Sequence, residues 1–69
     1  MAKHPLSRYE TYKIMELGAE AFCEGKTIDD YTNSIDDIMG IDHTDLSPAE
    51  REAIRDAFYE GKRVERDRK

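Results

Sequence analysis

The sequence predicts an all-α fold, a small domain of three short helices, and three observations support this prediction. Apolar residues recur at helical spacing in three stretches, each stretch follows a residue that can cap a helix, and each contains or meets a glycine near its expected end. A chain of 69 residues has room for one such core. The expected helices cover residues 7–24, 28–39 and 48–62 of a single domain, residues 1–69, with a basic C-terminal tail and with residues 1–6 and 65–69 mobile.

The first helix is expected to begin at Ser7, because Ser7 and Glu10 have the spacing of a capping box. Gly25 can adopt the left-handed conformation that ends a helix. Gly18 lies on the apolar face and leaves room for a close crossing with another helix. At 100° per residue this face comprises Ile14, Met15, Gly18, Ala21 and Phe22.

The second helix is expected to follow Thr27 as its N-cap and to end at Gly40. Its two faces separate cleanly at the helical period. The apolar face comprises Ile28, Tyr31, Ile35, Ile38 and Met39, and the opposite face carries Asp29, Asp30, Asp36 and Asp37.

The third helix has the strongest local signal, with Ser47 at the N-cap, Pro48 at the first helical position and Glu50 two residues later. Its apolar stripe comprises Ala53, Ile54, Ala57, Phe58, Gly61 and Val64. The sequence leaves open whether the residues after Gly61 extend the helix or fray. The core expected from the three helices consists of Ile14, Leu17, Phe22, Ile28, Tyr31, Ile35, Ile38, Leu46, Ile54, Ala57 and Phe58.

Two hexapeptides resemble each other: residues 21–26 read AFCEGK and residues 57–62 read AFYEGK. The echo is explained either by a duplicated helical unit or by two helices that independently use an aromatic anchor and a glycine stop. The sequence leaves both explanations open.

Acidity is concentrated in residues 27–50, which hold seven Asp or Glu and neither Lys nor Arg. Residues 1–26 hold four bases and four acids, and residues 51–69 hold seven bases and five acids, so the three parts sum to the net charge of −5. Exposed helices usually mix charge signs, since like charges one turn apart destabilise a helix. The segment is therefore either a solvated face or a binding face. Arg51 and Arg55 of the third helix are candidates to pair with its acids.

Several classes of protein are disfavoured by composition. No apolar run approaches the roughly 20 residues of a membrane span, and residues 1–5 lack the apolar stretch of a signal peptide. Cys23 is the single cysteine, which excludes an internal disulfide, predicts a semi-buried thiol and favours a reducing cytoplasm. Net negative charge opposes direct binding to nucleic acid or to anionic lipid.

Neither catalysis nor a cofactor is expected. The sequence has no Gly-rich phosphate loop, and no nucleophile stands beside a base in a recognisable order. The stretch Asp42-His43-Thr44-Asp45 places three metal-ligating side chains in one loop, but this spacing matches no known closed metal site. Polar residues before an N-cap are ordinary turn chemistry, so no metal site is expected.

The functional hypothesis is a small, acidic, non-enzymatic inhibitor or regulator that occupies the nucleic-acid-binding groove of a host protein. Phage anti-restriction and anti-CRISPR proteins use this strategy, and an acidic helix face suits a groove lined by Lys and Arg. The alternative is a homo-oligomeric scaffold whose acids serve only solubility, with a homodimer formed through the first helix. The candidate partner-binding residues are Asp29, Asp30, Asp36, Asp37, Asp42, Asp45, Tyr12 and Met15.

Overall fold

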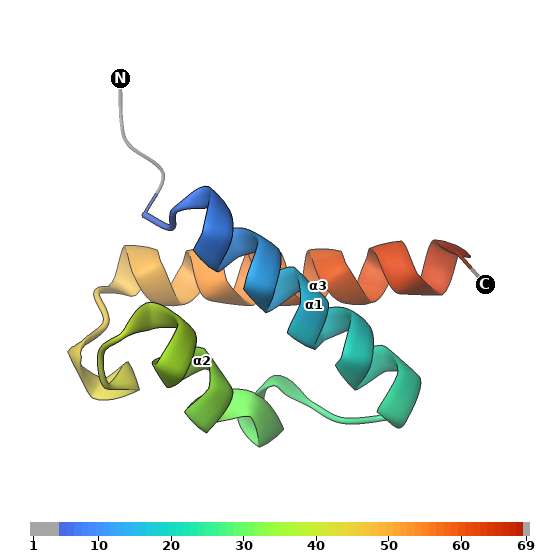
Figure 1. Ribbon diagram of the computed structural model, residues 1–69, viewed down its shortest axis with the longest axis horizontal. Coiled ribbons are helices and arrows are strands. Elements are labelled where there is room, and N and C mark those ends of the chain that lie inside the picture. Colours follow the sequence, from blue (N-terminus) through green and yellow to red (C-terminus); the bar gives the residue numbers. More distant parts are fainter. Residues whose placement is uncertain (1–4, 69) are drawn as a thin grey trace.

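A computed structural model describes residues 5–68 and contains three α-helices and two short 3-10 helices, with no strand among these residues (Figure 1). The elements in chain order are α1 (Arg8–Glu24), η1 (Ile28–Tyr31), α2 (Thr32–Met39), η2 (His43–Asp45) and α3 (Pro48–Arg68). The predicted all-α class with three helices is confirmed.

Both predicted capping boxes form. The Ser7 amide donates to Glu10 Oε1 at 2.8 Å, and the Glu10 amide donates to Ser7 Oγ at 3.1 Å. Ser47 and Glu50 exchange the same pair of bonds at 2.9 and 3.2 Å. Gly25 has φ 69°, the left-handed conformation expected at the end of α1. Local sequence therefore specifies where α1 begins and ends and where α3 begins.

The second helix differs from the expectation, because its first turn is a 3-10 helix rather than α-helix. The Asp30 amide donates to the Thr27 carbonyl at 3.1 Å, a bond between residues three apart. The Asp30 carboxylate accepts from the Thr27 amide at 3.0 Å and holds this tight turn closed. A 3-10 turn advances about 120° per residue instead of 100°, so it changes which way the following side chains point.

The third helix continues to Arg68, and the expectation that it ends at residue 62 is wrong. Gly61 is buried within the helix and does not stop it. Residues 65–68, expected to be mobile, are helical. In the segment 1–6, also expected to be mobile, Leu6 is buried with 4% of its surface exposed. Residues 1–4 and 69 lie outside the described residues.

The main packing contact is the crossing of α1 over α3 (Figure 1). A methyl group added at Gly18 would overlap the carbonyl oxygen of Phe58 and lie 3.2 Å from the Lys62 amide nitrogen. One added at Gly61 would overlap the carbonyl oxygen of Met15. The two backbones touch directly because neither glycine has a side chain. The close crossing expected at Gly18 is confirmed, and Gly61 is its counterpart.

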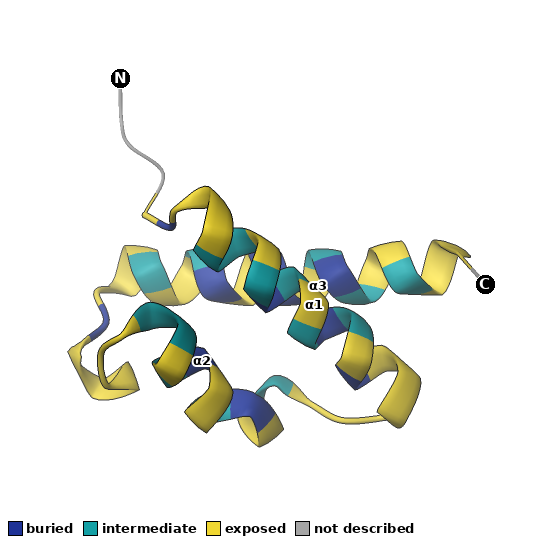
Figure 2. Cartoon of the chain, viewed as in Figure 1, coloured by how far each residue is buried: buried dark blue, intermediate teal, exposed yellow. Residues whose placement is uncertain are grey.

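The core lies between α1 and α3 and extends to α2 (Figure 2). Of the eleven expected core residues, ten are buried or packed against the core. The buried set also contains two residues outside the expected list, Leu6 and Ala21. It comprises Leu6, Ile14, Ala21, Tyr31, Ile35, Leu46, Ile54, Ala57 and Phe58, with Leu17, Ile28 and Ile38 partly buried against it.

Phe22 is the exception, since 37% of its surface is exposed and its place in the core was wrongly predicted. The buried residues of α1 are Ile14, Gly18 and Ala21, and Gly18 meets the backbone of α3 directly. The aromatic ring packed against Phe58 is Tyr31, with ring centroids 5.9 Å apart. The Tyr31 hydroxyl donates to Glu20 Oε2 at 3.0 Å, which satisfies its polar end.

Candidate functional site

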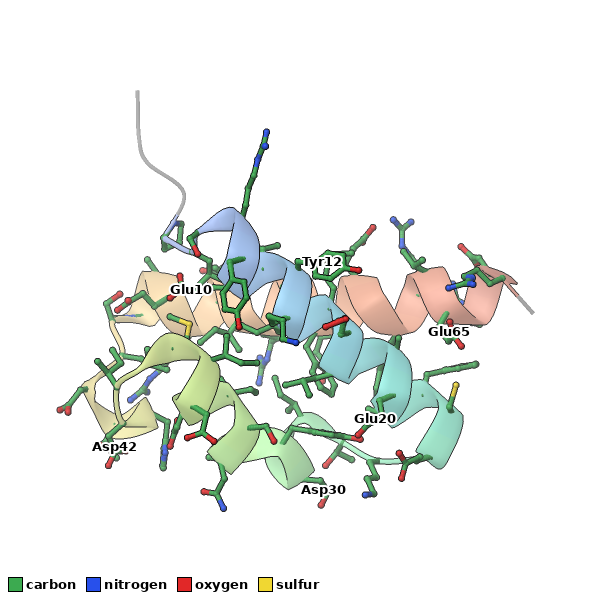
Figure 3. All side chains as sticks on the ribbon, in the orientation of Figure 1. Glu10, Tyr12, Glu20, Asp30, Asp42 and Glu65 are labelled. Atoms are coloured by element: carbon green, nitrogen blue, oxygen red, sulfur yellow. The ribbon has the colours of Figure 1, made fainter. Side chains whose placement is uncertain are left out.

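The acidic segment of residues 27–50 folds into η1, α2 and η2, which connect α1 to α3. Four of its aspartates are exposed on η1, α2 and η2, and we call them the acidic surface: Asp29, Asp30, Asp37 and Asp45. In Figure 3, Asp30 lies in η1, just before α2, and Asp42 lies beyond the end of α2, both at the edge of the molecule away from the crossing of α1 and α3. The charge is therefore presented to solvent by a part of the chain that contributes little to the main packing contact.

Two of the predicted acids also shape the backbone. Asp30 holds η1 through the Thr27 amide. Asp42 caps η2, because its Oδ1 accepts from the Thr44 amide at 3.1 Å. This hydrogen bond lowers the pKa of Asp42, since it stabilises the carboxylate. Both side chains remain exposed, so they serve local structure without leaving the surface.

Asp36 does not lie on the outer acidic face where the helical period placed it. Its side chain is only 23% exposed, and Oδ2 lies 3.0 Å from His43 Nδ1. The other oxygen, Oδ1, is buried without a hydrogen-bond partner in the described part of the chain. The 3-10 turn explains why Asp36 departs from its predicted position, because residues after Tyr31 are rotated relative to those before it. Asp29 and Asp36 do not form one stripe.

His43 joins Asp36 and Asp42 into a small polar cluster. Its Nδ1 lies 3.0 Å from Asp36 and 3.2 Å from Asp42. The hydrogen bond with Asp36 raises the pKa of His43, because the carboxylate favours the protonated ring, while partial burial and the Arg51 guanidinium act in the opposite direction. Protonated His43 therefore ties η2 to α2.

The same three residues could offer ligands to a metal, since one ligand atom from each falls within 4.8 Å of the others. The set is partly exposed, and hydrogen bonds between its members already account for its geometry. The absence of a metal site stays a prediction.

The two remaining predicted residues are on α1, apart from the acidic surface. Tyr12 is 64% exposed, as a contact residue should be. Met15 is partly buried, packs against the core, and has its carbonyl group against Gly61. Cys23, predicted to be semi-buried, is exposed, and its thiol donates to Glu65 Oε2 at 3.2 Å. Tyr9, about one helical turn before Tyr12, is also exposed.

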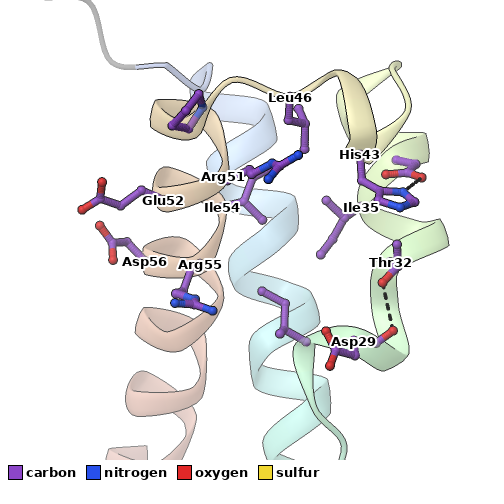
Figure 4. A pocket seen from close by; sticks show the side chains of 13 residues that line it. Asp29, Thr32, Ile35, His43, Leu46, Arg51, Glu52, Ile54, Arg55 and Asp56 are labelled. Atoms are coloured by element: carbon purple, nitrogen blue, oxygen red, sulfur yellow. Dashed lines mark hydrogen bonds and ion pairs between the residues drawn. The ribbon is translucent and has the colours of Figure 1, made fainter.

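A groove of about 780 Å³ separates α2 from the first half of α3 (Figure 4). Its floor is apolar and comprises Ile28, Ile35, Leu46 and Ile54. Arg51 and Arg55 project into it from α3, and Asp29, Thr32 and His43 lie on the other side. Neither arginine forms an ion pair with the acids of α2 within residues 5–68, so the expected pairing is not found. Sequence reasoning missed the groove, although arginines four residues apart were its available signal.

Comparison with known protein families, with curated proteins and with solved structures found no match. Among the described residues, none of the helices combines the length and the apolar character that a membrane crossing requires.

Proposed function

We propose that the protein is a non-enzymatic regulator that binds a protein partner through its acidic surface and competes there with nucleic acid. The observation that carries the proposal is the charge of residues 27–50, seven acids without a single Lys or Arg. Five of these acids are exposed, and the four that do not pair with His43 form the acidic surface: Asp29, Asp30, Asp37 and Asp45. A groove that binds phosphates is lined by Lys and Arg, and a compact array of carboxylates complements it.

The position of these carboxylates supports the proposal. They belong to η1, α2 and η2, whereas the packing of α1 on α3 holds most of the core. None of the four forms an ion pair with Lys or Arg within residues 5–68. Like charges gathered in this way oppose folding slightly, and binding to a basic partner in the cytoplasm would compensate for that cost. Small phage anti-restriction and anti-CRISPR inhibitors act by this principle.

A second candidate function is a homo-oligomeric scaffold, and the aromatic surface of α1 favours it. Tyr9 and Tyr12 are 65% and 64% exposed, and Phe22 is 37% exposed. Exposed aromatic residues are enriched at protein interfaces. In this reading α1 forms the contact between copies and the acids keep the assembly soluble. A Tyr12→Glu variant then loses assembly in sedimentation, while neutralising the acids leaves it intact.

The primary proposal is tested by capture from a bacterial lysate on the immobilised full chain. The test variant carries Asp29→Asn, Asp30→Asn, Asp37→Asn and Asp45→Asn. The amide side chain introduced at position 30 keeps an oxygen that can accept from the Thr27 amide. The matched control removes four exposed charges elsewhere through Glu24→Gln, Glu52→Gln, Asp56→Asn and Asp67→Asn.

We expect the parent and the control to capture a nucleic-acid-binding protein that added duplex DNA or RNA releases. The test variant should not capture it. Equal capture by the test variant, or a captured protein that nucleic acid does not displace, contradicts competition at a nucleic-acid site.

A further inference from the structure

The groove between α2 and α3 has an apolar floor and two arginines without ion partners in the described part of the chain. Arg51 and Arg55 are one helical turn apart on α3, and both are exposed. In Figure 4 they project toward α2, while Glu52 and Asp56, which also line the groove, point to the other side of α3. The part of α3 that faces α2 therefore presents two guanidinium groups.

The opposite wall has a different character. Asp36 is engaged with His43 at 3.0 Å, so its charge is partly satisfied within the protein. Thr32 donates its hydroxyl to the Asp29 carbonyl at 2.9 Å, which leaves the Asp29 carboxylate at the edge of the groove. A ligand thus meets cationic groups on one side and Asp29 on the other, with isoleucine and leucine side chains between them.

We propose that this groove binds an acidic amphipathic helix of a partner protein. Carboxylates of that helix would pair with Arg51 and Arg55, and its apolar side chains would enter between α2 and α3. Guanidinium groups recognise carboxylates well because they donate two parallel hydrogen bonds. The proposal rests on residues other than those of the proposed function, apart from Asp29, which belongs to the acidic surface and also lines the groove.

A helix suits the groove better than an extended strand. Both walls are helices whose backbone groups are bonded internally, so they offer no free edge for a strand to pair with. A helix satisfies its own backbone and presents side chains only. The volume of about 780 Å³ lies within the range of established binding pockets and accommodates more than one side chain.

The test uses the full chain and a displayed library of helix-forming peptides. Each peptide carries leucine at fixed positions along one face and random residues elsewhere. We expect enriched peptides to carry Asp or Glu beside the leucines. In NMR spectra of the labelled protein, such a peptide should shift the methyl signals of Ile35, Leu46 and Ile54.

Charge reversal tests the role of the arginines. An Arg51→Glu/Arg55→Glu variant should lose about tenfold or more of the affinity for an enriched peptide, because a hydrogen bond to a charged group is worth about that factor. It should gain affinity for the same peptide with Lys in place of its acids. The matched control is Arg8→Glu/Arg66→Glu, which changes two exposed arginines outside the groove and should bind like the parent.

Circular dichroism confirms that the variants are folded, and an Arg51→Gln/Arg55→Gln variant provides a milder change. The proposal is overturned if no peptide is enriched, if the enriched peptides are basic, or if the shifted signals lie outside the groove. It is also overturned if reversal in the groove and reversal outside it have the same effect.

Discussion

Gly18 and Gly61 occupy matching positions in the crossing of α1 and α3. Each glycine lies against a backbone carbonyl group of the other helix, and that carbonyl belongs to the residue three positions before the other glycine. Gly18 meets the Phe58 carbonyl, and Gly61 meets the Met15 carbonyl. The contact is therefore locally symmetric, and backbone meets backbone on both sides. A side chain at either position must push the two helices apart.

Gly18→Ala and Gly61→Ala should each destabilise the fold. Overpacking typically costs about 1–3 kcal/mol, and rigid backbone atoms place these sites at the upper end. Alanine recovers about 1 kcal/mol of helix propensity, so we expect a net loss of about 2 kcal/mol, measured by urea unfolding. The control is Gly25→Asn, where an added Cβ has open space and Asn tolerates the left-handed backbone. Alanine variants as stable as the parent would mean that α1 and α3 do not cross at these glycines.

Phe58 and Phe22 offer a matched comparison, because each stands in the same Ala-Phe-x-Glu-Gly-Lys context. Phe58→Ala should cost about 3–5 kcal/mol, comparable with the whole stability of a domain this small. Phe58 is fully buried, whereas Phe22 is 37% exposed, so Phe22→Ala should cost much less. Thermal unfolding followed by circular dichroism checks the order. Similar losses for both variants would place Phe22 in the core after all.

The helix starts and the two glycines at positions 25 and 61 show what local sequence can and cannot predict. Capping residues at Ser7 and Ser47 interact with their own neighbours, so the helix starts were predictable. Gly25 and Gly61 have the same local context, yet one caps α1 and the other lies in the crossing. That difference arises from the contact of Gly61 with Met15, a residue 46 positions away, and helical periodicity carries no information about it.

The misplaced Asp36 has a separate cause. The predicted exposure of Asp36 depended on one continuous α-helix from residue 28, but residues 28–31 form a 3-10 turn. The error in helix phase turned an expected surface charge into a partner of His43. Exposure of Asp29, Asp30 and Asp37 was predictable because the apolar residues of the segment occupy the other face. The groove was not predictable, since it depends on how α2 and α3 are placed.

Tyr31 should ionise at unusually high pH. Burial raises its pKa to about 12, and the hydrogen bond to Glu20 adds to the effect. The folded state holds this proton more tightly than the unfolded state, so the stabilisation is present below about pH 10 and is lost as pH rises toward 12. Ultraviolet titration should show a tyrosinate transition near pH 12 that Tyr31→Phe removes. Glu20→Gln should shift it only partly, because burial is the larger cause, and an unchanged titration in Tyr31→Phe would contradict the assignment.

His43 should stabilise the protein at acidic pH. Its pKa is raised above the ordinary 6.5 by Asp36, so the folded state binds the proton more strongly than the unfolded state. This stabilisation is complete below about pH 6.5 and disappears as pH rises through the higher folded value. NMR titration of His43 measures the shift, and Asp36→Asn should bring the pKa back toward 6.5. A pKa in the parent no higher than in Asp36→Asn would show that the pair does not form.

The central claim is that the acidic surface binds a basic partner, and the most direct measurement is affinity across salt concentration for a captured target. The Asp29→Asn/Asp30→Asn/Asp37→Asn/Asp45→Asn variant is compared with the parent and with the matched charge control, after circular dichroism has shown that all three are folded. We predict that the variant binds more weakly at low salt and that its affinity falls less steeply as salt rises, because fewer charges contribute. The control should follow the parent. A variant that binds as tightly as the parent, with the same dependence on salt, would contradict the claim and leave the aspartates as a solvated face.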